Sequence, residues 1–168
     1  TGFREVAAAY QQADPSDRVA WVGPSMSARS SITARQMETW AHAQAIADEL
    51  GIERSEDDRI RNIVVLGVNT FGWSFMVRGM EVPEGPPALH LTSPSGESWE
   101  YGNPESDQVI RGMAHEFAQV VTQTRNIADT RLVCEGDIAE LWMRNAQCFA
   151  GAAAEPPAPG VRCTKSPR

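Results

Sequence analysis

The stretch of sequence that decides the fold is METWAHAQAIADELG, residues 37–51. Its apolar side chains, among them Met37, Trp40 and Leu50, recur at the spacing of one helical face. Gly51 follows at the place where a helix commonly ends in a left-handed residue. We therefore expect an amphipathic helix that ends at Gly51, the best-defined element of the sequence.

The same helix carries a carboxylate and an imidazole four residues apart. Glu38 and His42 are therefore expected on one face, close enough to converge on a cation. Imidazole with carboxylate suits zinc or a similar divalent metal. An ordinary solvated Glu–His pair is the commoner outcome of this spacing, and a catalytic zinc site needs a third protein ligand. Both interpretations stay open on the spacing alone.

The N-terminal side of this helix predicts a shorter helix and a loop. Apolar residues recur at helical spacing from Phe3 to Tyr10. Residues 18–31 are rich in helix breakers, so we expect a loop there. Ser30 or Ser31 is the expected N-cap of the long helix.

The C-terminal side predicts one more buried helix and then a change of architecture. Residues 60–78 are dense in apolar side chains, and we expect a single helix closed at Gly79. The proline-rich segment 83–87 marks a break in composition. We place a domain boundary there, between a helical part over 1–82 and an α/β part over 83–151.

The α/β part is expected to hold a small sheet with helices on one face. Its predicted elements are strands at 88–92, 97–102, 107–110 and 130–134 and helices at 113–124 and from 136 to about 151. The turn chemistry of residues 93–96 predicts that the first two strands form a hairpin. Residues 152–168 are rich in Ala and Pro without periodicity, and we expect a disordered tail.

Composition restricts the possible partners. The 168-residue chain carries a formal net charge of −7, the wrong sign for a general binder of nucleic acid or anionic membranes. No apolar run approaches the ~18 residues that a membrane span needs. Cys134, Cys148 and Cys163 are odd in number and unpatterned, which favours a reducing, cytoplasmic location. We expect a small-molecule substrate, with no nucleic acid or membrane partner.

Few other residues stand out as chemical candidates. His90 is expected to be partly exposed in a strand and His115 to lie on a solvated helical face, so neither is a strong candidate for the third ligand. Arg125, at the end of a helix, could bind an anion or satisfy helix carbonyls, the second role being commoner. Five aromatic residues could line an apolar pocket but are more often core: Trp21, Trp40, Phe71, Trp73 and Phe75.

Residues 37–51 resemble the last bundle helix of the DinB-like metalloenzymes, specifically the mycothiol-dependent maleylpyruvate isomerase family. Other stretches that fit the same relatives are residues 23–28, 66–68, 136–137 and 146–151. The resemblance covers nearly all of residues 1–151. It implies the C-terminal half of a DinB-like helical bundle followed by a small sterol-carrier-like α/β domain, an α+β fold.

The resemblance also implies a site. Glu38 and His42 fall on the metal ligands of the family's fourth helix, and Arg125 on an arginine that its C-terminal domain contributes to the active site. The family's third ligand, a His of the second helix, has no counterpart, because this chain begins where the third helix would begin. We expect either a missing N-terminal segment or a homodimer to complete the bundle.

The implied activity is that of an enzyme dependent on a divalent metal, zinc by preference, and on mycothiol or a similar low-molecular-weight thiol. It would act as an isomerase or S-transferase on a small electrophilic or unsaturated acid, with Arg125 anchoring a carboxylate. Ala43 and Ala45 stand where the relatives carry Gly and Asp, and loss of that Asp is expected to loosen ligand orientation. The alternative is a non-catalytic apolar-ligand binding or dimerising module.

Overall fold

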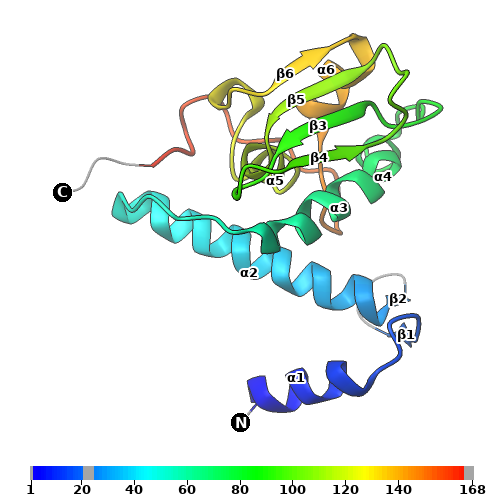
Figure 1. Ribbon diagram of the computed structural model, residues 1–168, viewed down its shortest axis with the longest axis vertical. Helices are drawn as coiled ribbons and strands as arrows, with labels where there is room; N and C mark the ends of the chain where they lie inside the picture. The colour runs from blue at the N-terminus through cyan, green and yellow to red at the C-terminus, as the bar shows by residue number, and fades with distance from the viewer. Residues whose placement is uncertain (1, 21–24, 165–168) are drawn as a thin grey trace.

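The computed structural model describes residues 2–20 and 25–164. Over these residues the fold is mixed α+β, as predicted, and it contains six α-helices and two small sheets (Figure 1). The α-helices are α1 (Gly2–Gln12), α2 (Ala28–Leu50), α3 (Arg61–Asn69), α4 (Phe71–Met76), α5 (Ala114–Val121) and α6 (Asp137–Asn145). The strands are β1 (Arg18–Val19), β2 (Met26–Ser27), β3 (Ala88–Thr92), β4 (Ser98–Tyr101), β5 (Val109–Met113) and β6 (Val133–Glu135).

The long helix α2 ends as predicted but begins earlier. Gly51 has a φ of 67° and donates its backbone N–H to Ala47 and Asp48, so the expected left-handed C-terminus is confirmed. The N-cap is Ser27, whose side chain accepts a hydrogen bond from the Ser30 N–H, and not Ser30 or Ser31. The preceding segment, expected to be a loop, contains the short antiparallel strands β1 and β2.

The prediction of a single helix over 60–78 is wrong, because this segment forms two helices. A 3₁₀ turn at Asp58–Ile60 leads into α3, and the helix is interrupted at Thr70 before α4. The Thr70 hydroxyl donates at 2.8 Å to the Leu66 carbonyl, which also accepts from the Thr70 N–H at 3.0 Å, and a side-chain bond of this kind often bends a helix. The density of apolar residues indicated burial and could not locate this bend.

The four-stranded sheet has the order β4-β3-β5-β6. Strands β3 and β4 form the predicted antiparallel hairpin, β3 pairs parallel with β5, and β5 pairs antiparallel with β6. Helices α5 and α6 cover one face of the sheet, as expected (Figure 1). The last helix ends at Asn145, about six residues before the predicted end, because Ala146 has an extended backbone with ψ 134°.

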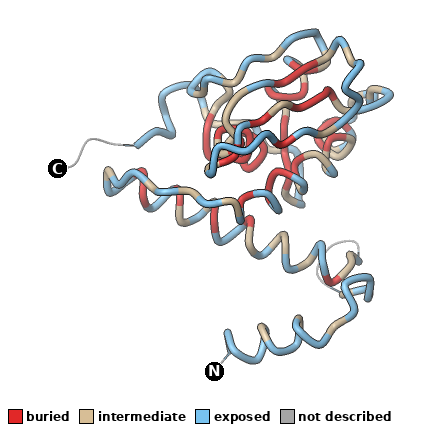
Figure 2. The backbone as a smooth tube through the Cα atoms, viewed as in Figure 1, coloured by how far each residue is buried: buried red, intermediate tan, exposed pale blue. Residues whose placement is uncertain are grey.

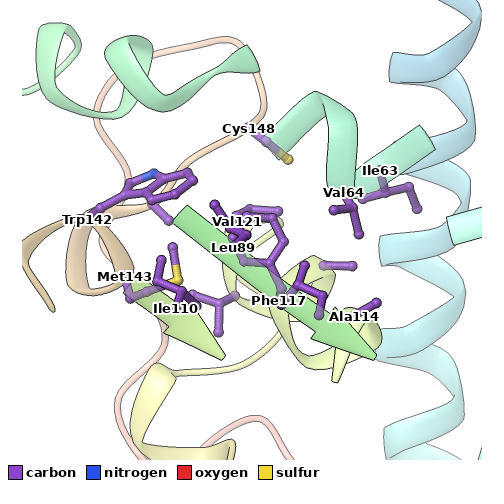
Figure 3. Packing of buried hydrophobic residues seen from close by; sticks show 14 of the residues in the cluster. Ile63, Val64, Leu89, Ile110, Ala114, Phe117, Val121, Trp142, Met143 and Cys148 are labelled. Atoms are coloured by element: carbon purple, nitrogen blue, oxygen red, sulfur yellow. The ribbon is translucent and has the colours of Figure 1, made fainter. Parts of the chain in front are cut away.

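The core lies between the sheet and the helices α3 to α6 (Figures 2 and 3). Ile63 and Val64 of α3 pack with Phe117 of α5, Leu89 of β3 and Trp142 of α6, all fully buried. The helical elements α3 and α4 thus share one core with the α/β part, although the composition break at 83–87 separates them in sequence.

The predicted aromatic residues divide between core and surface. Phe71 and Phe75 are buried, with ring centroids 5.1 Å apart, and Phe71 meets Trp142 edge to face at 5.0 Å, so the core interpretation is confirmed for them. Trp73 is half-buried and donates its indole N–H to the Phe149 carbonyl. Trp21 lies outside the described residues.

The described part of the expected tail, residues 152–164, has no helix or strand but is held by hydrogen bonds. The Ala154 N–H donates to Gln147 at 3.0 Å, and the Asn126 amide donates to the Pro157 carbonyl at 2.7 Å. The Gly160 N–H donates to the Asp129 carboxylate at 2.9 Å. The apolar periodicity that guided the sequence analysis carries no signal for such contacts, because most of them use backbone groups.

Candidate functional site

The predicted metal ligands lie on the solvent-exposed flank of α2. His42 Nε2 and Glu38 Oε2 are 3.5 Å apart, and the two side chains are 81% and 55% exposed. The helix therefore places one imidazole and one carboxylate side by side with most of their surface free to bind another group. Two such donors fit part of the ligand set of a divalent cation.

A third ligand does not join them among the described residues, in which no group of three or more His, Cys, Asp or Glu side chains could hold a metal. His90 lies on β3, where its Nδ1 is 3.8 Å from Glu100 of the neighbouring strand. His115 lies in the first turn of α5. Among the described residues, Glu38 and His42 are thus a pair of neighbouring donor side chains that no third His, Cys, Asp or Glu joins.

Arg125, the predicted substrate anchor, is engaged in a buried ion pair. Its two terminal nitrogens contact the two oxygens of Asp48 at 2.5 and 2.6 Å, and both side chains are 9% exposed. Gln44, one turn earlier on α2, donates to Asp48 at 2.8 Å. Burial raises the pKa of Asp48, but the hydrogen bonds from Arg125 and Gln44 and the positive charge of Arg125 outweigh it, so the pKa is lowered overall.

The structure does not bring Arg125 to the Glu38–His42 pair. Asp48, the partner of Arg125, is six residues beyond His42, about 9 Å along the helix axis, and lies on the buried face. Arg125 also donates to the Thr124 carbonyl at 2.8 Å, but Thr124 lies beyond the end of α5 at Val121, so this bond does not satisfy a helix carbonyl. In this arrangement Arg125 fastens the α/β part to α2.

Asp48 and Gln44 are the residues that the sequence analysis missed. A signal was present, because both fall on the face of α2 that carries Met37 and Trp40, where a polar side chain must find a partner on burial. That signal identifies a buried polar contact without naming its partner, which comes from a segment 77 residues away.

A second polar cluster lies where residues 54–56 pass over α2. Arg54 stacks over the Trp40 ring at 5.4 Å and donates to the Trp40 carbonyl at 2.9 Å, and the Trp40 indole N–H donates to Glu56 at 2.9 Å. Trp40 is therefore buried, as is Met37, so the core interpretation of Trp40 is confirmed. The covering comes from α3 and from the segment that precedes it.

Two of the three cysteines cannot supply a thiolate near neutral pH. Burial raises the pKa of the Cys134 thiol to about 11, with a further contribution from Glu140. Burial likewise raises the pKa of Cys148, which is almost fully enclosed. A reaction of this protein that uses a thiolate would therefore draw on neither Cys134 nor Cys148.

Comparison with known proteins finds one matching family model and two similar proteins. Residues 1–47 match the family model of the mycothiol maleylpyruvate isomerase N-terminal domain. Two uncharacterized proteins of Mycobacterium tuberculosis, from strains CDC 1551 / Oshkosh and ATCC 25618 / H37Rv, are each 41% identical over 134 residues, or 80% of this chain. The chain spans about half the length of these curated relatives, 52% of each.

No solved structure matches the chain. Among the described residues, no helix is both long and apolar enough to cross a membrane. The segment that matches the family model includes both Glu38 and His42. The first 47 residues of the chain are therefore similar to the N-terminal domain of mycothiol maleylpyruvate isomerase, which supports the resemblance noted in the sequence.

Proposed function

We propose that this protein is a divalent-metal and thiol-dependent isomerase or S-transferase that acts on a small electrophilic or unsaturated acid. The observation that carries the proposal is the Glu38–His42 pair, which lies 3.5 Å apart, exposed, and inside the segment similar to the family's N-terminal domain. An isomerase returns the thiol unchanged, whereas a transferase leaves it bonded to the product. The thiol we propose is mycothiol or a similar small thiol.

Glu38 and His42 are proposed to supply two of the metal ligands. Their donor set, one carboxylate oxygen and one imidazole nitrogen, suits zinc. A divalent cation bound there would lower the pKa of a coordinated thiol and so generate a nucleophile at neutral pH. The third ligand must come from a segment other than the described residues or from a second copy.

Arg125 is proposed to hold the α/β part against α2 through its ion pair with Asp48. As a carboxylate anchor it would have to exchange Asp48 for the substrate, and separating a buried, doubly hydrogen-bonded pair is costly. We therefore assign to Arg125 first the role of holding the α/β part against α2, and a substrate role only in a form of the protein that releases Asp48. The two roles differ in their expected effect on stability, which is large only for the first.

We also propose the finer architecture that the resemblance implies. In this proposal, α1 and α2 are half of a DinB-like metal-binding bundle, and the sheet β3–β6 with α5 and α6 is a sterol-carrier-like domain. Support comes from the match of residues 1–47 to the family model and from the strand and helix order of residues 88–145. The low cysteine content supports a cytoplasmic location for the activity.

The alternative function, binding of an apolar ligand in the α/β part, has less support. The aromatic rings that could line a pocket there, those of Phe71, Phe75, Phe117 and Trp142, pack against one another at centroid distances of 5.0 to 5.6 Å. Phe71 and Phe75, two of the aromatic residues that were considered as a pocket lining, are thus part of the core.

The proposed activity is tested by supplying zinc, a small thiol and a cis-unsaturated dicarboxylic acid, and following the products by mass spectrometry and NMR. We expect either cis–trans isomerisation or a thioether adduct, lost on chelation and in His42→Ala. His90→Ala is the matched control, because His90 also lies beside a glutamate, at 3.8 Å, but outside the matched segment. Activity that survives both chelation and His42→Ala would overturn the proposal.

A further inference from the structure

Residues 152–164 run from the α/β part toward the C-terminal end of α2 without forming a helix or strand (Figure 1). None of them is buried, and three are prolines: Pro156, Pro157 and Pro159. Proline fixes the backbone φ, so the segment has few alternative conformations and keeps an extended shape. The segment contributes no residue to the hydrophobic core, and hydrogen bonds hold it in place.

The first three residues of this segment, which we call its root, are held by a cluster of enclosed polar side chains. Gln147, 1% exposed, donates to the Ala152 carbonyl at 3.1 Å and accepts from the Ala154 N–H at 3.0 Å. Gln123, 6% exposed, donates to the Ala154 carbonyl at 2.9 Å, and Arg78 donates to the same carbonyl. Leaving buried polar groups unpaired is costly, so the root is firmly fixed.

The remaining residues, 155–164, form an arm that is held by separate hydrogen bonds near the surface. Asn126 donates to the Pro157 carbonyl at 2.7 Å, and the Gly160 N–H donates to the Asp129 carboxylate at 2.9 Å. Asp129 and Gly160 are both exposed, so water can replace either partner. A segment with few buried contacts and exposed hydrogen bonds opens locally at a low cost in free energy.

The arm ends on the buried ion pair that joins α2 to the α/β part. The Thr164 hydroxyl donates at 3.4 Å to Asp48 Oδ1, the carboxylate oxygen that also accepts from Arg125. Arg162 donates at 3.3 Å to the Gln123 carbonyl, two residues before Arg125. The arm thus contacts both segments that supply the pair.

We propose that residues 155–164 are a latch that closes over the Asp48–Arg125 pair and opens about the root while the α/β part stays folded. The open latch admits water and small anions, such as carboxylates, to Arg125, and the closed latch excludes them. The hydrogen bonds that hold the latch involve neither Glu38 nor His42, so the latch does not rest on the proposed enzymatic function.

Hydrogen exchange of the full chain tests the local opening. We expect the Gly160 N–H to exchange at least about tenfold more slowly than in an unstructured peptide, and the Ala154 N–H of the root more slowly still. The N–H of Leu91, in the core strand β3, should be the slowest of the three. Exchange of Gly160 at the unstructured rate would overturn the closed latch, and equal rates for Gly160 and Leu91 would overturn its local opening.

The covering of Arg125 is tested by treating the full chain with an arginine-specific dicarbonyl reagent and mapping the labelled residues by mass spectrometry. Asp129→Ala removes the acceptor of the Gly160 N–H. We expect Arg125 to be labelled about tenfold faster, because loss of a hydrogen bond to a charged group shifts the opening equilibrium by about that factor. Gly160→Pro removes the donor and cannot adopt the φ of 74°, so it should accelerate labelling at least as much.

Asp129→Asn is the matched control, because it removes the same charge but keeps a side-chain oxygen that can accept from Gly160. It should label Arg125 within about threefold of the wild-type rate. Arg59, 85% exposed, is the internal reference and should react equally in every variant. Unchanged labelling of Arg125 in both Asp129→Ala and Gly160→Pro would overturn the proposal, as would equal acceleration by Asp129→Asn and Asp129→Ala.

Discussion

Helix α2 contributes to two acid–base pairs, one within the helix and one with Arg125, that lie in opposite surroundings. Glu38 and His42 stand in solvent, 55% and 81% exposed, with a single contact of 3.5 Å between them. Asp48 meets Arg125 through two short hydrogen bonds, and both side chains are 9% exposed. The first pair contributes little to stability and has exposed surface that a ligand could contact. The second pair joins α2 to the segment after α5 and is shielded from solvent.

The difference teaches that burial, and not residue type, separates an available site from a structural contact. An exposed ion pair contributes at most about 1 kcal/mol, because water competes for both partners. Removing one member of a buried pair costs several times more, because the remaining charge stays desolvated.

The largest effect is expected from Arg125→Ala. The substitution leaves the Asp48 carboxylate buried without its cation, and we expect the free energy of unfolding to fall by about 3–5 kcal/mol, measured by urea denaturation. The double variant Asp48→Ala/Arg125→Ala should lose clearly less than the sum of the two single variants. A loss below 1 kcal/mol in Arg125→Ala would contradict a structural role for the pair.

A smaller effect is expected where α3 crosses α5, beside this junction. A Cβ added at Gly67 would lie 2.9 Å from Val121 Cγ2 and 3.0 Å from Phe117 Cε1, too close for either to stay in place. Gly67→Ala should therefore lower the free energy of unfolding by about 1–3 kcal/mol.

Gly72→Ala is the control for Gly67→Ala. Its Cβ would lie 3.5 Å from Val82 Cγ1, an ordinary contact, in the helix α4. It should be neutral or stabilise by up to about 1 kcal/mol, because alanine favours helix over glycine. Equal effects of the two substitutions, in the same urea titrations, would show that α3 and α5 are not closely packed at this point.

The pH dependence of stability should follow Asp48. Its pKa is lower in the folded than in the unfolded chain, so the unfolded state binds more protons in acid. The contribution of Asp48 is complete above its unfolded pKa of about 3.9 and is lost as pH falls through its lower folded pKa. Unfolding measured between pH 2 and 6 should be less steeply dependent on pH in Asp48→Asn than in the wild type. Identical slopes would show that Asp48 does not contribute to the pH dependence of stability.

Much of the fold could be predicted from residue patterns. The helix that ends at Gly51 and the hairpin of β3 and β4 follow from local periodicity and turn chemistry, which act over a few residues. The break at Thr70 could not be predicted, because it depends on a competing side-chain bond in an otherwise apolar run.

The candidate site divides in the same way. The adjacency of Glu38 and His42 follows from a spacing of four on a helix, and the structure has them 3.5 Å apart. The partner of Arg125 does not follow from any local pattern, because Asp48 lies 77 residues away and meets it only once the core has formed. Long-range polar contacts depend on tertiary packing, and sequence periodicity carries no information about them.

The smallest effect on stability is expected at the exposed pair. Glu38→Ala and His42→Ala should change the free energy of unfolding by less than about 0.5 kcal/mol, because solvent already satisfies both side chains. Urea titrations of these variants and of Arg125→Ala, run in parallel, would compare the stability contributions of the exposed and the buried pair. A loss of 2 kcal/mol or more in either variant would show that this pair, too, is structural.

Zinc titration of the protein by calorimetry tests whether the exposed Glu38–His42 pair binds a metal, as we propose, while the buried Asp48–Arg125 pair does not. We expect saturable binding that falls at least tenfold in affinity with Glu38→Ala or His42→Ala and is unchanged in His90→Ala. The absence of zinc binding, or binding that His42→Ala leaves unchanged, would contradict the claim.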